Sequence, residues 1–222
     1  MATMLEYEQT QTGDNPTHCV IWLHGLGADG NDFLPIVPQL NLKRTPAVRF
    51  IFPHAPMQAV TINNGYVMRA WYDILSPSLL EQQDASGIQQ SQHTLLGLIQ
   101  QQLDDGFIAQ NIILAGFSQG GAIALHTGLR FAQPLGGIMA LSTYLPLADQ
   151  LETDTAGLNK SLPILMAHGT HDPIIPIAAA AQSRQQLIAQ GYSVEWQKYS
   201  MEHSVCEDEI NDISGWLNKL IT

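Results

Sequence analysis

The pentapeptide 116–120, GFSQG, places Ser118 between two glycines, directly after the apolar run 111–117 and before the helical run 119–132. A serine at a strand-to-helix turn is exposed at the edge of a sheet, and flanking glycines remove the side chains that would clash there. The N-terminus of the following helix adds partial positive charge near the hydroxyl. An ordinary glycine-rich turn has the same pattern, so partner residues must decide whether Ser118 is a nucleophile.

A nucleophilic serine needs a histidine base, and the base needs a carboxylate that fixes its tautomer. On a parallel sheet, the expected chain order of this arrangement is serine, then acid, then histidine. Asp172 ends the segment HGTHD (168–172) after an apolar run, and His203 lies between the last strand candidate and the last helix candidate. Both positions fall at carboxyl ends of strands, where ligands bind in open α/β sheets. The sequence therefore predicts a triad of Ser118, His203 and Asp172.

Other titratable residues compete for these roles. His168 and His171 precede the predicted acid along the chain, and this order disfavours them as the base. Asp208 and Asp212 follow His203, which is outside the position expected for the acid. Four further histidines lie in or beside strand or helix patterns and are interpreted as structural or surface residues: His18, His54, His93 and His126.

Acyl transfer also needs backbone N–H groups that stabilise the negative oxygen of a tetrahedral intermediate. The residue after the nucleophile, Gln119, provides one such group at the start of its helix. The second comes from a loop after an early strand, and the glycine-rich segment 24–30 (HGLGADG) follows the apolar run 18–23. We therefore predict the N–H of Leu26 as the second donor, against the alternative of a plain turn. The segment lacks the lysine and hydroxyl pair of a phosphate-binding loop.

Short apolar runs alternate with helical patterns along the chain. The strand candidates are 18–23, 47–52, 111–117, 136–141, 162–167 and, with the alternating pattern of a sheet edge, 192–199. The helix candidates are 86–105, 119–132, 177–190 and 204–220. Continuously apolar runs are typical of strands that helices cover on both faces. We predict a mostly parallel, doubly wound sheet with helices on both faces, in a single domain over 1–222.

The segment 53–80 does not fit this alternation. It carries prolines, aromatic residues and the turn pair Asn64-Gly65, so we expect a long surface excursion with a short hairpin at that pair. Long structured loops in compact domains are often functional, which makes this excursion a candidate wall of the substrate site. The connection 142–161 follows the strand candidate 136–141 and has only twenty residues. This connection is too short for a multi-helix cap, so we expect no cap domain and no helical lid.

Composition narrows the possible partners. The 222 residues carry 20 acidic and 9 basic side chains, and the formal net charge of −11 argues against nucleic acid or an anionic membrane as a tightly held partner. The N-terminus lacks the pattern of a secretory signal, and no apolar run is long enough for stable membrane insertion, so we expect a cytoplasmic protein. Cys19 and Cys206 do not suggest a disulfide framework. No metal-ligand cluster such as H-E-x-x-H is present, so we expect neither a metal nor an organic cofactor.

Six sequence blocks, in the same order, resemble the carboxylesterase/phospholipase family, which includes bacterial carboxylesterases and acyl-protein thioesterases. The blocks are HGLGADGNDF (24–33), FPHAP (52–56), VTINNGYVMRAWYDI (60–74), GFSQGGA (116–122), HGTHDPIIP (168–176) and HSV (203–205). The resemblance implies an α/β-hydrolase fold, the same triad and oxyanion donors, and Trp71 near an acyl-binding groove. The excursion adds Met68 and Tyr72 as candidate apolar contacts of that groove, with core packing as the alternative for these side chains.

The resemblance implies a carboxylesterase that hydrolyses short to medium acyl esters, with a small acyl ester as substrate. The alternatives are an acyl-protein thioesterase or lysophospholipase and, from another class, a non-catalytic binding module, which the three filled triad positions disfavour. Family members often pair, so a homodimer is compatible with the sequence. Members also often carry glycine immediately before the catalytic histidine, where this chain has Glu202. A carboxylate folded inward raises the pKa of His203, but we expect Glu202 to point to solvent.

Overall fold

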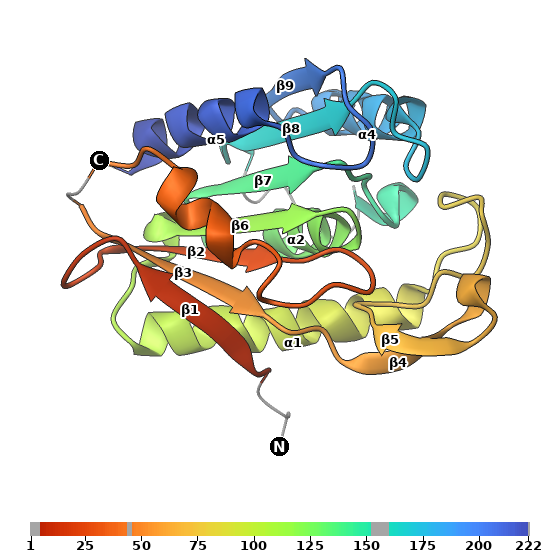
Figure 1. The fold of residues 1–222 in the computed structure, drawn as a ribbon, viewed down its shortest axis with the longest axis horizontal. Helices are drawn as coiled ribbons and strands as arrows, with labels where there is room; N and C mark the ends of the chain where they lie inside the picture. Colours follow the sequence, from red (N-terminus) through yellow and green to blue (C-terminus); the bar gives the residue numbers. More distant parts are fainter. Residues whose placement is uncertain (1–4, 44–45, 152–159, 222) are drawn as a thin grey trace.

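The computed structural model describes residues 5–43, 46–151 and 160–221 and is built around a seven-stranded sheet (Figure 1). The sheet has the order β1-β3-β2-β6-β7-β8-β9, and all neighbouring strands are parallel except β1 and β3. The strands are β1 (Tyr7–Gln11), β2 (His18–Leu23), β3 (Val48–Pro53), β6 (Ile112–Phe117), β7 (Gly137–Leu141), β8 (Ile164–Gly169) and β9 (Val194–Tyr199).

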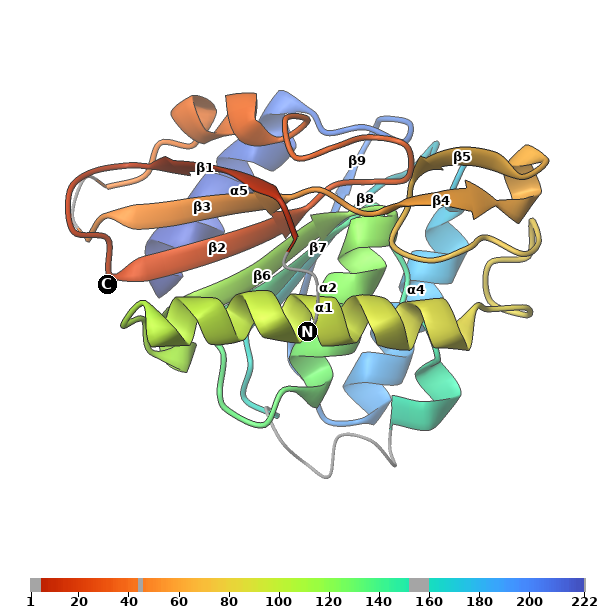
Figure 2. The ribbon, with the colours of Figure 1, turned by 90° about the horizontal axis from the view of Figure 1, so that it is seen from below.

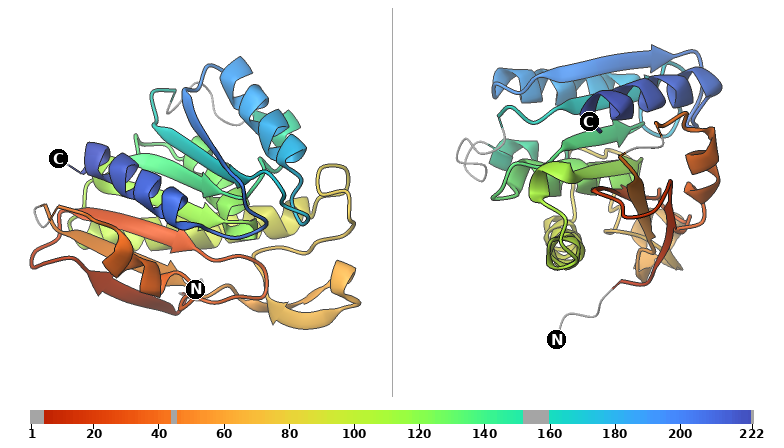
Figure 3. Two further views of the ribbon diagram at one scale, coloured as in Figure 1. Left: turned by 45° about the horizontal axis from the view of Figure 1, so that its top comes forward. Right: turned by 90° about the vertical axis from the view of Figure 1, so that its left-hand side faces the viewer.

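Helices cover both faces of this sheet (Figures 2 and 3). One face packs against α1 (Ala85–Asp104), α2 (Gln119–Arg130) and α4 (Ile177–Ala189), and the other against α5 (Glu207–Leu220) and the short helix η1 (Leu34–Gln39). Alternate residues of β2 show the division, because Ile21 belongs to the first apolar cluster and Trp22 to the second. The predicted doubly wound α/β architecture with helices on both faces is confirmed.

The predicted strands and helices occur in the expected order, and their observed bounds lie within three residues of the predicted ones. β9 lies at the sheet edge, as its alternating pattern indicates. β1 at the opposite edge was not predicted. Its segment YEQTQ is polar and half-buried, so no apolar pattern distinguishes it from a loop.

The excursion contains the expected hairpin. β4 (Met57–Val60) and β5 (Tyr66–Arg69) form a separate antiparallel pair, joined by the short helix η2 (Thr61–Asn63). Asn64 and Gly65 have φ angles of 56° and 75°, a left-handed conformation that favours these two residue types. The hairpin extends past the end of β3, beside the carboxyl ends of the parallel strands (Figure 1).

Three other expectations concern the connection 142–161, membrane spans and the cysteines. Residues 152–159 of the connection 142–161 lie outside the described residues, and the described part before them contains the short helix η4 (Ala148–Gln150). Among the described residues, no helix is both long and apolar enough to cross a membrane. Both cysteines are free thiols, and Cys19 is buried in the core.

Candidate active site

Ser118 occupies a sharp turn between β6 and α2. Its φ and ψ of 54° and −122° are rarely adopted by residues other than glycine, and such strain is concentrated at functional sites. The flanking glycines are required by close backbone approach. A methyl group on Gly116 would collide with backbone atoms of Gly120, and one on Gly120 would lie 2.5 Å from the carbonyl oxygen of His24. The serine turn (residues 116–120) therefore packs directly against the end of β2.

Hydrogen bonds to the backbone of Ser118 hold the serine turn in place. The Ser118 N–H donates to the Leu141 carbonyl (2.9 Å), and the Ser118 carbonyl accepts from the Ala122 N–H (3.1 Å). The Thr143 hydroxyl donates to the same carbonyl at 2.6 Å. Sequence reasoning missed Thr143, whose one signal is its place just after the strand candidate 136–141.

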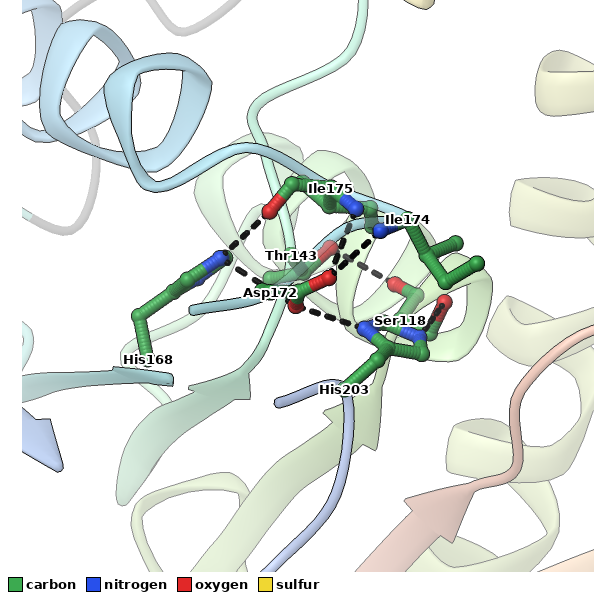
Figure 4. Close-up of polar contacts among 7 residues, drawn as sticks. All are labelled: Ser118, Thr143, His168, Asp172, Ile174, Ile175 and His203. Atoms are coloured by element: carbon green, nitrogen blue, oxygen red, sulfur yellow. Dashed lines mark hydrogen bonds and ion pairs between the residues drawn. The ribbon is translucent and has the colours of Figure 1, made fainter. Parts of the chain in front are cut away.

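Ser118, His203 and Asp172 come together from three different loops (Figure 4). His203 Nε2 lies 2.9 Å from Ser118 Oγ, and His203 Nδ1 lies 2.6 Å from Asp172 Oδ2. Because an ionised carboxylate only accepts hydrogen bonds, Nδ1 carries the proton and Nε2 can accept from the serine hydroxyl. The carboxylate is fully buried, whereas 16% of the His203 side chain is exposed. This arrangement can activate a serine hydroxyl for attack on an acyl carbon.

The predicted acid has a full set of hydrogen-bond donors. Asp172 Oδ1 accepts from the N–H groups of Ile174 (2.8 Å) and Ile175 (2.9 Å). The buried ring of His168 lies behind the carboxylate, with Nε2 2.8 Å from the Ile175 carbonyl and 3.4 Å from Asp172 Oδ2 (Figure 4). Burial lowers the pKa of His168, which keeps the ring neutral. His168, considered from the sequence only as a rival base, thus supports the acid and its loop.

The other rivals lie elsewhere on the surface. His171 is exposed, and Asp208 is exposed in the first turn of α5. Asp212 accepts a hydrogen bond from the Tyr199 hydroxyl at 2.8 Å. Glu202 is also exposed, which confirms the expectation that its carboxylate points to solvent.

The two predicted oxyanion donors lie on adjoining segments. Leu26 belongs to the 24–30 loop after β2, and Gln119 is the first residue of α2. A methyl group on Gly25 would lie 3.4 Å from Ser118 Cβ, so this loop borders Ser118. Within residues 5–43, 46–151 and 160–221, neither the Leu26 nor the Gln119 N–H donates to another residue. Both N–H groups are therefore available to a ligand beside Ser118.

The three predicted groove residues differ in exposure. Met68 is half-buried, and its sulfur faces the 24–30 loop, 3.6 Å from the point where a Gly27 Cβ would lie. Trp71 and Tyr72 are only 2% and 1% exposed, and the Tyr72 hydroxyl is hydrogen-bonded to the Tyr144 hydroxyl at 2.8 Å. Met68 thus keeps some open surface beside the 24–30 loop, whereas the two aromatic rings offer little. Among the described residues, no cluster of His, Cys, Asp or Glu is arranged to hold a metal ion.

One buried carboxyl group, in α5, leads to a prediction about stability. Glu209, in the first turn of α5, is fully buried, and neither oxygen has hydrogen-bond geometry with a described residue. Burial raises its pKa to about 8, and the nearby Cys206 N–H offsets only part of this effect. Because the folded-state pKa lies above the unfolded one, the proton stabilises the fold. This contribution is complete below about pH 4.5 and is lost as the pH rises toward 8.

We therefore expect Glu209→Gln to be more stable than the wild type, by an amount that grows from pH 5 to pH 8. At pH 8 the gain should be on the order of a few kcal/mol in the free energy of unfolding. Denaturant unfolding of both proteins at pH 5, 6.5 and 8 measures it. Glu207→Gln, which changes an exposed carboxylate of the same turn, is the control. If the stability difference between Glu209→Gln and the wild type did not change with pH, the raised pKa of Glu209 would be contradicted.

Known proteins resemble this chain over nearly its whole length. Residues 6–221 match the family model described as Phospholipase/Carboxylesterase. Acyl-protein thioesterase 1 of Gibberella zeae is 37% identical, over 91% of this chain and 90% of that protein. The crystal structure of SOBER1 from Arabidopsis thaliana has a TM-score of 0.86 and 30% identity, covering 92% of this chain and 99% of that one. Acyl-protein thioesterase 2 of Zea mays has a TM-score of 0.84 and 25% identity, covering 97% and 99%. The chain belongs to the phospholipase/carboxylesterase family of α/β-hydrolases.

Proposed function

We propose that this chain is a thioesterase that removes acyl groups from protein cysteines, with Ser118 as its nucleophile. The observation that carries the proposal is the continuous hydrogen-bond chain from Ser118 Oγ through His203 to Asp172, at 2.9 and 2.6 Å. The sequence alone favours an oxygen ester as the substrate. Similar proteins named acyl-protein thioesterase support the thioester alternative instead.

Acylation begins when Ser118 Oγ attacks the acyl carbon and His203 Nε2 takes the hydroxyl proton. The carbonyl electrons move onto the oxygen, which the N–H groups of Leu26 and Gln119 stabilise. The buried Asp172 carboxylate stabilises the imidazolium that forms. The intermediate then re-forms its carbonyl and breaks the carbon–sulfur bond, and His203 gives its proton to the leaving sulfur. The products of this half-reaction are acyl-Ser118 and a free cysteine.

Deacylation repeats the same steps with water as the nucleophile. His203 takes a proton from water, the hydroxide attacks the acyl carbon, and the second intermediate expels Ser118, which recovers its proton from His203. One thioester and one water therefore give one carboxylic acid and one thiol. The cycle balances with the chain's own residues, so the proposal includes neither a metal nor an organic cofactor.

The leaving group distinguishes the thioester from the ester reaction. A cysteine thiol has a pKa of about 8.5, so a thiolate can depart with little proton transfer. An alkoxide is far more basic, because the pKa of its parent alcohol is closer to the value of about 15.7 for water. Oxygen esters therefore depend more strongly on His203 as the general acid, although the triad and the oxyanion donors are the same for both substrates.

A matched pair of substrates tests the choice between thioester and ester. One peptide is octanoylated on cysteine, and its twin on serine at the same position. After correction for the rate of each with hydroxide, we expect kcat/KM for the thioester to exceed that for the ester by at least about tenfold, or about 1.4 kcal/mol. If the corrected ratio of kcat/KM for thioester over ester were one or less, the chain would be assigned as a carboxylesterase instead. Both activities should disappear in Ser118→Ala.

A further inference from the structure

We propose that Trp71 is a positioning residue of the oxyanion hole rather than a wall of the acyl groove. Trp71 joins two segments: the 24–30 loop, which carries the Leu26 N–H, and the serine turn, which carries the Gln119 N–H. The inference rests on the proposed function, because an oxyanion hole is meaningful only if Ser118 attacks an acyl carbon. Three sets of contacts carry it.

The first set ties Trp71 to the serine turn. The Trp71 backbone N–H donates to Oε1 of the Gln119 side chain at 2.7 Å. The Gln119 side chain in turn donates through its Nε2 to the Tyr72 carbonyl, also at 2.7 Å. The Gln119 side chain therefore holds the main chain of the excursion at two points. Any shift of Trp71 acts on the residue whose backbone N–H is the first oxyanion donor.

The second set ties Trp71 to the 24–30 loop. Its indole N–H donates to the His24 carbonyl at 2.9 Å, and the two rings lie 5.3 Å apart. The His24 ring is buried, which lowers its pKa to about 4 and keeps it neutral. Its Nε2 accepts from the Ala55 N–H (3.0 Å), so its Nδ1 carries the proton and donates to the Gly25 carbonyl (2.7 Å).

These bonds set the direction of the Leu26 N–H. The Gly25 carbonyl and the Leu26 N–H belong to one peptide unit, which is planar and trans, so the two groups point in opposite directions. A carbonyl held by His24 therefore fixes the N–H on the other side of the same plane. Trp71 completes this arrangement, because its indole N–H donates to the His24 carbonyl and so holds His24 in place.

The third observation is that Trp71 has no polar group left for a substrate. Its carbonyl accepts a hydrogen bond from the Ser91 hydroxyl, so its N–H, C=O and indole N–H are all engaged within the protein. The residue is only 2% exposed. Trp71 also lines a cavity of about 900 Å³ between the hairpin and α1, which makes a substrate contact the competing role. The two roles predict different kinetics.

Trp71→Phe keeps an apolar ring and removes the indole N–H. If Trp71 positions the oxyanion donors, kcat should fall by about 10- to 100-fold while KM changes by less than about twofold, because misplacement of the donors affects only the transition state. A wall residue would give the opposite split, a raised KM and an altered preference for acyl length with kcat nearly constant. Steady-state kinetics on thioesters of six to sixteen carbons distinguish the two results.

A trifluoromethyl ketone of matched chain length provides a second measurement. Ser118 Oγ adds to its carbonyl, the serine proton passes to His203, and the resulting anionic oxygen occupies the oxyanion hole. Its Ki should rise in Trp71→Phe by the same factor by which kcat/KM falls. The corresponding thioether, which has no carbonyl, should bind both proteins equally. Equal ketone affinity in the two proteins would overturn the proposal.

Trp22→Phe is the matched control. Trp22 is 1% exposed, and its indole nitrogen has no partner among the described residues, so the same substitution removes equal volume and no hydrogen bond. It should lower stability and leave kcat and ketone affinity unchanged; an equal loss of kcat would overturn the proposal.

Gln119→Met removes the other contact of Trp71. The double variant of Trp71→Phe and Gln119→Met should lose little more activity than the worse of the two single variants. Failure of the proposed function would instead appear as activity that survives Ser118→Ala.

Discussion

Ser118→Ala should lower kcat by a factor on the order of 10⁶, since loss of the nucleophile removes the benefit of the whole triad. The fold should be retained because, among the described residues, the hydroxyl is hydrogen-bonded only to His203, whereas the strained turn is held through the backbone. The Ser118 N–H and carbonyl keep their bonds to Leu141, Ala122 and Thr143 in the variant. Turnover of an acyl thioester by the purified protein, with circular dichroism to verify folding, measures the effect.

Ser204→Ala is the natural control, because Ser204 is an exposed serine next to His203. It should retain wild-type turnover and labelling by a fluorophosphonate, whereas Ser118→Ala should lose both. Residual turnover above a few per cent of wild type in Ser118→Ala would mean that another group is the nucleophile.

The sequence predicts the parts of the site that are fixed by local geometry and chain order. Glycines at 116 and 120 are needed where the serine turn packs against the end of β2, so their spacing makes Ser118 a candidate nucleophile. Parallel strands bring their carboxyl ends to one edge, so the loops after β8 and β9 must lie beside β6 and β7. Chain order then selects Asp172 and His203 among several rivals.

The supporting residues cannot be found in the same way. Thr143 and the Gln119 side chain act through contacts with residues far along the chain. The polar contacts of His168 lie within its own loop, but nothing in the residue types there tells a supporting histidine from a base. β1 is equally hidden, because its polar residues become a strand only through the edge of β3. Trp71 is part of a family motif, but the motif does not reveal whether its ring faces a ligand or the protein interior. Only the three-dimensional partners distinguish these roles.

Asp172→Asn should lower kcat by roughly 10⁴-fold, and the structure gives a specific reason. Oδ1 of Asp172 accepts two N–H groups, from Ile174 and Ile175, so the carbonyl oxygen of an asparagine will take that position. The amide NH₂ must then face His203 Nδ1, where the carboxylate oxygen Oδ2 lies in the wild type. Nδ1 becomes an acceptor, the ring proton moves to Nε2, and the base can no longer take the serine proton.

The same reasoning predicts that Asp172→Asn affects chemistry far more than binding. KM should change little, since the carboxylate is buried behind His203, and the thioether analogue should bind as it does to the wild type. Asp208→Asn removes an exposed carboxylate from the first turn of α5 and should leave kcat within about twofold, as expected for a surface change away from the site. If Asp208→Asn were the damaging substitution and Asp172→Asn the mild one, the acid of the triad would have to be reassigned, because only one carboxylate can hold the imidazole of His203 in its basic tautomer.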